Sequence, residues 1–215
     1  MLNVFRDPPV SALIFDLDGT LLDTAEDLAA SVNFARLHFE LPALPVRTVT
    51  GYVGDGVNLL IERSFAGTGI QLETAKPVMS GHYKEHMLDL TRPYPGVAET
   101  LARLLQKKAV ATNKPAEFVP GLLAHFGLDG FFELIVGGNS LPVRKPDAAI
   151  VDYVAQKLGI DKLEIVVVGD HRTDLALGQN AGIRTVFCEY GIGHDDGMVP
   201  TARIRTFSEL QTIFC

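Results

Sequence analysis

Short apolar runs and helically spaced apolar residues follow one another along this chain. Residues 11–16 (SALIFD) are apolar up to their final carboxylate, which predicts a strand, and residues 17–20 (LDGT) are typical of a turn. From Thr24 onward, apolar residues recur every three or four positions, which predicts a helix of about four turns. The pattern from residue 11 onward therefore predicts a strand, a loop and a helix, in that order.

The next stretch of the chain is expected to be helical throughout. Residues 41–45 break the first helix, and helical spacing returns at residues 57–65 and at about residues 74–88. Between Asp23 and Leu90 the pattern contains no convincing strand. This stretch is therefore interpreted as a helical insertion after the first strand.

Beyond residue 96, predicted helices and strands alternate. Helices are expected at residues 97–107, 116–126, 147–158 and 173–181, and strands at residues 108–112, 134–136, 165–169 and 185–188. Alternation of this kind predicts parallel strands joined by crossover helices. Residues 165–168 (IVVV) are apolar on both faces, as expected of a central strand that is covered by helices on both sides.

The predicted fold class is therefore α/β, with a Rossmann-like, doubly wound parallel sheet as the core and an inserted all-helical domain. The core is expected to comprise residues 1–22 and 91–215, and the helical domain residues 23–90.

Composition and charge narrow the class of partner. The chain has 215 residues, 47% of them hydrophobic and 21% charged, which is too apolar for a disordered protein. Its 19 basic and 26 acidic residues give a net charge of −7, which argues against nucleic acid or an anionic membrane as the main partner. No apolar run approaches the length of a membrane span, so the chain is expected to be soluble and unprocessed.

Cysteine usage points to a reducing compartment. Cys188 and Cys215 are the only cysteines in the sequence, and they do not form a CxxC motif. Neither a disulfide framework nor a multi-cysteine zinc site is available to such a chain. The expected location is the cytoplasm.

The unusual polar residues follow the predicted strands, where ligands bind in open α/β sheets. They are Asp16 and Asp18 after the first strand, Thr112, Asn113 and Lys114 after the next, Lys145 in a loop before a helix, and Asp170 with Asp174 after the IVVV strand.

Two of these carboxylates are expected to share one site. Residues two apart in an extended chain point to the same side, so Asp16 and Asp18 would lie together while Gly19 lets the chain turn away. With Asp170 nearby, the carboxylates would repel one another unless a cation joins them. Mg²⁺ fits best, because it combines a few carboxylates with water and phosphate oxygens. Lys145 and Lys114 would add positive charge for a phosphate, so the set suits phosphoryl transfer.

Four ordered motifs resemble those of haloacid dehalogenase-type phosphatases. They are residues 16–24 (DLDGTLLDT), Thr112, Lys145 with Pro146, and residues 169–170 (GD) with Asp174. Within that superfamily, residues 24–33 (TAEDLAASVN), residues 54–57 with Leu60 and Arg63, and residues 112–115 (TNKP) are similar to phosphoglycolate phosphatases. The resemblance implies a Rossmann-like core with a helical cap, and hydrolysis of small phosphate monoesters, 2-phosphoglycolate above all, with Mg²⁺.

The resemblance also assigns roles to the residues of the first motif. Asp16 would be the nucleophile that forms an aspartyl-phosphate, and Asp18 would protonate the leaving oxygen and then activate water. Asp16, the backbone carbonyl of Asp18 and the side chain of Asp170 would ligate Mg²⁺, and Asp174 would position these ligands.

The remaining motif residues are assigned to the phosphate. Thr112 would hold a phosphate oxygen through its hydroxyl, Lys145 would neutralise developing charge, and Asn113 and Lys114 would border the phosphate. The expected partner is a small phosphorylated metabolite, with neither nucleic acid nor membrane, for a monomer or homodimer.

Several alternatives remain open at this point. A sugar phosphomutase would use the same aspartyl-phosphate, and a phosphate-binding regulatory module would perform no chemistry. A dehalogenase is disfavoured because it has no need of the acid/base group of Asp18. The pair His82 and His86 could bind a metal, although a solvated helix face is the preferred interpretation. Residues 54–56 (GDG) fit a cap loop that reaches the active site, or an ordinary loop before a helix.

Overall fold

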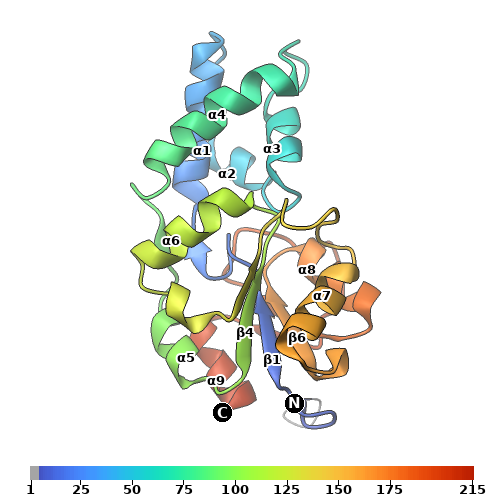
Figure 1. Ribbon diagram of the computed structural model, residues 1–215. Helices are drawn as coiled ribbons and strands as arrows, with labels where there is room; N and C mark the ends of the chain where they lie inside the picture. Colours follow the sequence, from blue (N-terminus) through green and yellow to red (C-terminus); the bar gives the residue numbers. More distant parts are fainter. Residues whose placement is uncertain (1–4) are drawn as a thin grey trace.

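A six-stranded parallel sheet forms the centre of the molecule (Figure 1). The computed structural model describes residues 5–215. The strand order is β5-β4-β1-β6-β7-β8, and every neighbouring pair in this sheet is parallel. The strands are β1 (Ala12–Phe15), β4 (Lys107–Ala111), β5 (Leu134–Val136), β6 (Ile165–Gly169), β7 (Arg184–Cys188) and β8 (Ala202–Ile204). The predicted parallel α/β fold is confirmed.

The two central strands are apolar on both faces because helices cover both sides of the sheet. In the register of β1 and β6, Ala12 pairs with Ile165 and Phe15 with Val168. Side chains alternate between the faces, so Phe15 joins one hydrophobic cluster and Ile14 the other. The IVVV strand thus occupies the central position that its sequence predicts.

Different helices pack on the two faces of the sheet (Figure 1). One face carries α7 (Ala149–Leu158) and α8 (Arg172–Ala181). The other carries α5 (Val97–Arg103), α6 (Val119–His125), which follows a single 3₁₀ turn, and the C-terminal α9 (Leu210–Phe214). The carboxyl ends of the strands are left free of these layers.

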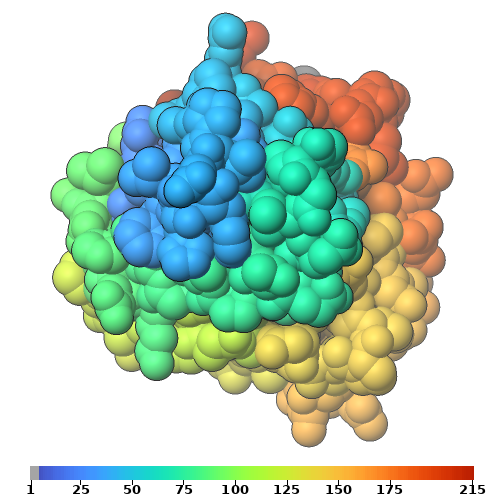
Figure 2. Space-filling model, turned by 90° about the horizontal axis from the view of Figure 1, so that it is seen from above, coloured from blue at the N-terminus to red at the C-terminus, as the bar shows by residue number. Residues whose placement is uncertain are grey.

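The inserted helices lie together beyond the carboxyl ends of the strands (Figure 1). They are α1 (Ala25–His38), α2 (Val46–Thr50), α3 (Val57–Ser64) and α4 (Leu72–His86), and α1 packs against both α4 and α2. Seen from above, they cover the middle of the molecule, with later parts of the chain visible around them (Figure 2). The chain leaves and re-enters the core through a short antiparallel ribbon of β2 (Leu22–Asp23) and β3 (Arg92–Pro93).

The helix expected at residues 97–107 ends earlier, at Arg103, and β4 begins at Lys107 instead of residue 108. The backbone of Leu104 is extended, which stops the helix. The Lys108 ammonium then donates to the carbonyls of Leu104 and Gln106, at 2.7 and 2.8 Å. A buried lysine thus satisfies carbonyls at the helix end, where many helices use a glycine turn.

Other expected boundaries shift for local reasons. The first strand is limited to Ala12–Phe15, and the helix expected from residue 147 begins at Ala149, because the Asp147 side chain accepts a hydrogen bond from the Ala149 amide at 2.9 Å. Sequence periodicity did not predict β2, β3, α2, β8 or α9, which are too short to produce a pattern. None of the helices between residues 5 and 215 is both long and apolar enough to cross a lipid bilayer.

A buried carboxylate ties the inserted helices to the returning chain. Asp27 in the first turn of α1 is 2% exposed. It accepts hydrogen bonds from the amides of Leu90 and Thr91, at 3.0 and 2.8 Å, and from the Thr91 hydroxyl at 2.8 Å. Asp27 lies more than sixty residues from Leu90 and Thr91 in sequence, so the contact closes the insertion at its base.

We expect Asp27→Ala to lower the free energy of unfolding by about 2–4 kcal/mol, because three donors, two of them buried, lose their acceptor. Urea unfolding followed by circular dichroism measures the loss. The exposed neighbour Glu26 gives the matched control, Glu26→Ala, whose loss should stay below about 1 kcal/mol. Equal losses in the two variants would contradict this role of Asp27.

Candidate active site

Carboxylates from two strand ends and a helix converge at one point. Asp16 follows β1, Asp170 follows β6, and Asp174 lies in the first turn of α8. All three are buried, and one carboxylate oxygen of each lies within 4.8 Å of the others. The structure thus brings Asp16 together with Asp170 and Asp174, whereas the expectation that the Asp18 carboxylate shares this cluster is wrong, because that side chain pairs with Lys114 instead.

The turn after β1 forms through the backbone of Leu17. Its carbonyl accepts hydrogen bonds from the amides of Thr20, Leu21 and Leu22, while its own amide donates to the Asp16 carboxylate at 2.7 Å. Gly19 has a φ of +84°, and a Cβ there would lie 2.0 Å from Asp170 Oδ2. Only glycine allows this close approach, so the turn and the acidic cluster depend on each other.

Lys145 lies between two of these carboxylates. Its ammonium is 2.9 Å from Asp16 Oδ1 and 2.6 Å from Asp174 Oδ1, and the lysine is 3% exposed. Burial raises the pKa of Asp16 to about 6, against the opposing effect of the Lys145 charge. Burial alone would lower the pKa of Lys145, but Asp16 and Asp174 outweigh it and raise that pKa, so the ammonium stays charged.

Asp170 is held by the loop that follows β7. Its carboxylate accepts hydrogen bonds from the amides of Ile192 and Gly193, at 2.9 and 2.8 Å, and from the Thr20 hydroxyl at 3.0 Å. Burial, with the charges of Asp16 and Asp174, raises the pKa of Asp170 well above its usual value. Buried carboxylates that repel one another in this way fit a hard divalent cation, which prefers oxygen donors.

Asp174 contacts the site as well as capping its helix. One carboxylate oxygen pairs with Lys145 and the other accepts a hydrogen bond from the His171 amide at 3.1 Å. A Cβ at Gly169 would lie 2.2 Å from the Asp174 carboxyl carbon, so the strand end is shaped to admit this side chain. Asp174 therefore both caps α8 and contacts the site.

Asp18 lies apart from the acidic cluster, toward the inserted helices. Its Oδ1 accepts hydrogen bonds from the Lys114 ammonium at 2.9 Å and from the Thr24 hydroxyl at 2.7 Å. The Lys114 ammonium also lies 4.5 Å from the centre of the Tyr83 ring. Sequence reasoning missed both Thr24 and Tyr83. Thr24 could have been found as the last residue of the first motif, whereas Tyr83 carries no signal in the sequence.

Thr112 and Asn113 connect the strand end to the inserted helices. Thr112 follows the last residue of β4, and its amide donates to Val136 at 2.9 Å, so the strand holds it in place. The Asn113 side-chain amide donates to the carbonyls of Gly54 and Lys145, at 2.9 and 3.1 Å. Asn113 therefore anchors the loop at residues 54–56 against the core.

That loop reaches the site, as one of the two sequence-based alternatives expected. A Cβ at Gly54 would lie 2.5 Å from the His171 ring, so the loop backbone contacts the start of α8 directly. The Asp55 carboxylate pairs with Arg172 at 2.6 Å and with Arg63 at 2.7 Å. Arg172 belongs to the core and Arg63 to α3, so Asp55 links the two parts of the molecule.

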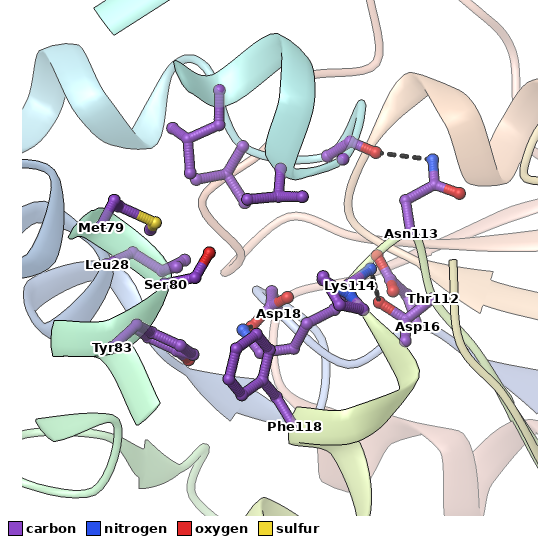
Figure 3. Close-up of a pocket in the computed structure, with 16 residues that line it drawn as sticks. Asp16, Asp18, Leu28, Met79, Ser80, Tyr83, Thr112, Asn113, Lys114 and Phe118 are labelled. Atoms are coloured by element: carbon purple, nitrogen blue, oxygen red, sulfur yellow. Dashed lines mark hydrogen bonds and ion pairs between the residues drawn. The ribbon is translucent and has the colours of Figure 1, made fainter. Parts of the chain in front are cut away.

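A cavity of about 50 Å³ lies between the strand ends and the inserted helices (Figure 3). From the core it is lined by Asp16, Asp18, Thr112, Asn113, Lys114, Pro115 and Phe118, and from the insertion by Leu28, Val53, Gly54, Gly56, Val57, Leu60, Met79, Ser80 and Tyr83. The core side therefore carries the charge, and the helical side is largely apolar.

His82 and His86 do not share a metal site. Their rings stack at 4.3 Å, and His82 also stacks on Phe34. The Nδ1 of His82 contacts Ser31 at 3.0 Å, and that of His86 contacts Asp89 at 2.9 Å. Within residues 5–215, Asp16, Asp170 and Asp174 form the one cluster of three side chains that could hold a metal ion.

Comparisons with known proteins place this geometry in context. Residues 13–188 match the model of the family described as haloacid dehalogenase-like hydrolase. A phosphoglycolate phosphatase of Haemophilus influenzae is 36% identical over 193 residues, covering 84% of this chain and 86% of that protein. A phosphoglycolate phosphatase of Psychrobacter arcticus is 34% identical over 213 residues, covering 92% of this chain and 93% of that protein.

A solved structure has nearly the same fold. It is described as a predicted phosphoglycolate phosphatase from Haemophilus somnus, and it superimposes with a TM-score of 0.90 at 31% identity. The match covers 95% of this chain and 97% of the other.

Proposed function

The chain belongs to the haloacid dehalogenase-like hydrolase family, and on that premise we propose that it is a Mg²⁺-dependent phosphatase of small phosphate monoesters, with 2-phosphoglycolate as the favoured substrate. One observation carries the proposal. Asp16 lies beside Lys145 and the acidic cluster, and Asp18 lies beside the same cavity. A nucleophile, an acid and a cation site thus meet around a space that fits a small molecule. The names of the similar phosphatases support the choice of substrate.

Asp16, Asp170 and the backbone carbonyl of Asp18 would hold Mg²⁺, and Asp174 would position these ligands. The hard carboxylate oxygens and their burial suit this ion. When bound, the ion would offset the charge of the carboxylates and of the phosphate, so that an anionic nucleophile can approach an anionic substrate.

The chemistry follows from the placement of the two motif aspartates. Asp16 attacks phosphorus, the bond from phosphorus to the leaving oxygen breaks, and Asp18 gives a proton to that oxygen. Asp18 then takes a proton from water as the water attacks the aspartyl-phosphate. The second step releases phosphate and restores the Asp16 carboxylate.

The neighbouring residues bind the phosphate and hold the nucleophile. Lys145, which is fixed by Asp174, neutralises negative charge that develops on the phosphate. Thr112 offers its hydroxyl to a phosphate oxygen, and Asn113 and Lys114 border the phosphate. Asn113 also keeps the loop at residues 54–56 closed over the site.

We assign the inserted helices to a cap domain of residues 23–90, on a core of residues 1–22 and 91–215. This cap would exclude water and select the leaving group. We place the enzyme in the cytoplasm, as a monomer or homodimer, with a small phosphorylated metabolite as its partner and no role for nucleic acid or a membrane. A phosphomutase would bind a sugar phosphate at the same residues, and the names of the similar phosphatases favour hydrolysis instead.

A phosphate-release screen tests this function. The panel contains 2-phosphoglycolate, sugar phosphates, nucleotides and pyridoxal phosphate, each with Mg²⁺ and with a chelator. We expect kcat/KM for 2-phosphoglycolate to exceed that for the other esters by about tenfold or more, since a small cavity discriminates by size. We also expect the chelator to abolish turnover.

Product analysis separates the alternatives. Free phosphate is the product of a hydrolase, whereas transfer to a second hydroxyl of a sugar phosphate would identify a phosphomutase. Absence of metal-dependent turnover on every ester would contradict the proposal and favour a regulatory module.

A further inference from the structure

The Tyr83 side chain lines the cavity and carries a buried hydroxyl (Figure 3). Tyr83 lies on α4, near the end of the inserted helices, and is 2% exposed. Its hydroxyl oxygen is buried, and among residues 5–215 no acceptor lies within hydrogen-bond distance of it. A buried polar group without a partner is costly and uncommon. A ligand that supplies the missing partner would explain why this hydroxyl is buried here.

The missing partner is an acceptor. Burial raises the pKa of Tyr83 to about 12, so the phenol keeps its proton at neutral pH. The Lys114 ammonium, which lies over the ring, has protons to donate and no lone pair with which to accept. The phenol proton therefore needs an oxygen that the described residues do not provide.

The ring cannot readily turn to find such an oxygen elsewhere. It packs edge-on against Phe118, with 5.2 Å between the ring centres, and the Lys114 ammonium lies over its face at 4.5 Å. Lys114 is fixed in turn by its ion pair with Asp18. The Tyr83 ring, which lines the cavity, is thus held in place by contacts from the core.

Its position is that of a leaving-group contact. In the proposed mechanism Asp18 gives its proton to the leaving oxygen. Lys114 pairs with Asp18, and Tyr83 contacts Lys114 from the cap side. Lys114 is the only cationic side chain among the described residues that line the cavity. The rest of the cap wall is apolar except for Ser80, one turn before Tyr83 (Figure 3). The Lys114 ammonium on the core side and the Tyr83 donor in the largely apolar cap wall together match a small anionic group.

We propose that Tyr83 is a specificity-determining residue, whose hydroxyl donates a hydrogen bond to the carboxylate of the leaving group beside the Lys114 ammonium. The inference rests on the proposed function and names the part of 2-phosphoglycolate that the cap recognises. A cavity with charged core residues on one side and a largely apolar cap on the other suits a small leaving group with one anionic end, as in a two-carbon acid.

The test compares two esters that differ in one group. Ethyl phosphate has the two carbons of 2-phosphoglycolate with a methyl group in place of the carboxylate. We expect Tyr83→Phe to lower the ratio of kcat/KM for 2-phosphoglycolate to kcat/KM for ethyl phosphate by about 10- to 100-fold, the effect of losing a hydrogen bond to a charged group. Most of the change should appear in KM. Tyr153→Phe, on α7 outside the cavity lining, is the matched control and should leave the ratio unchanged.

The ratio is independent of how much of the variant folds, because both esters are assayed on one preparation. An unchanged ratio, or equal losses on the two esters, would overturn the carboxylate contact while leaving the phosphatase intact. A wild-type enzyme that hydrolyses ethyl phosphate at least as well as 2-phosphoglycolate would do the same. A wild type that releases phosphate from neither ester overturns both the proposed function and the contact that rests on it.

Discussion

Asp16→Asn is expected to lower kcat for phosphate release by about four orders of magnitude or more, because an amide cannot form the covalent intermediate. Asn has the size of Asp and carries no charge that must be buried, so the variant should fold. Its thermal unfolding midpoint checks this directly. The assay is steady-state phosphate release from 2-phosphoglycolate with Mg²⁺.

The matched control removes a carboxylate that lies outside the site. Asp152 on α7 is exposed and pairs only at the surface with Lys162, at 3.3 Å. Asp152→Asn should therefore retain kcat within about twofold, since surface pairs of this kind contribute little. If Asp16→Asn kept more than a tenth of the wild-type kcat, Asp16 could not be the nucleophile.

Lys145→Met should lower kcat by about 10²- to 10³-fold, the loss observed when one preorganised charge or donor is removed from a transition state. Methionine preserves the length and the apolar stem of the side chain. It leaves Asp16 and Asp174 without the ammonium that lies 2.9 and 2.6 Å from them. Since burial already raises the pKa of Asp16 to about 6, loss of the positive charge should raise it further and leave less of the nucleophile ionised.

Two measurements separate this catalytic effect from a loss of folding. Phosphate release gives kcat, and thermal unfolding reports whether the protein stays folded under the assay conditions. Lys162→Met removes the other half of the exposed pair and should change neither value appreciably. A folded Lys145→Met enzyme with kcat within tenfold of wild type would exclude the assigned role.

The core could be predicted because its signals are local. The run IVVV reports burial on both faces of one strand, and alternation of helices and strands implies a parallel sheet whose carboxyl ends meet at one edge. Residues that follow different strands, such as Asp16 and Asp170, therefore come together whatever the details of the loops. Several boundaries shifted by a few residues, in two cases where a side chain, Lys108 or Asp147, bonds to the backbone at a helix end.

The cap side of the site could not be predicted in the same way. Tyr83 is one of several aromatic residues in a helical pattern, and nothing in its neighbourhood distinguishes a cavity residue from a core residue. Its relation to Lys114 depends on how α4 packs against α1 and on where β4 ends. The pairing of Asp55 with Arg172 likewise joins residues more than a hundred positions apart.

By itself the sequence determined the parallel α/β core, the helical insertion after the first strand and the acidic residues of the site, because each follows from the order of short local patterns. The tertiary structure alone decided that Lys145 bridges Asp16 and Asp174, that Asp18 lies with Lys114 and Thr24, and that the Tyr83 hydroxyl is left without an acceptor among the described residues. The physical reason is that ion pairs and burial depend on distances between side chains that the packing of separate elements sets, and no local pattern encodes those distances.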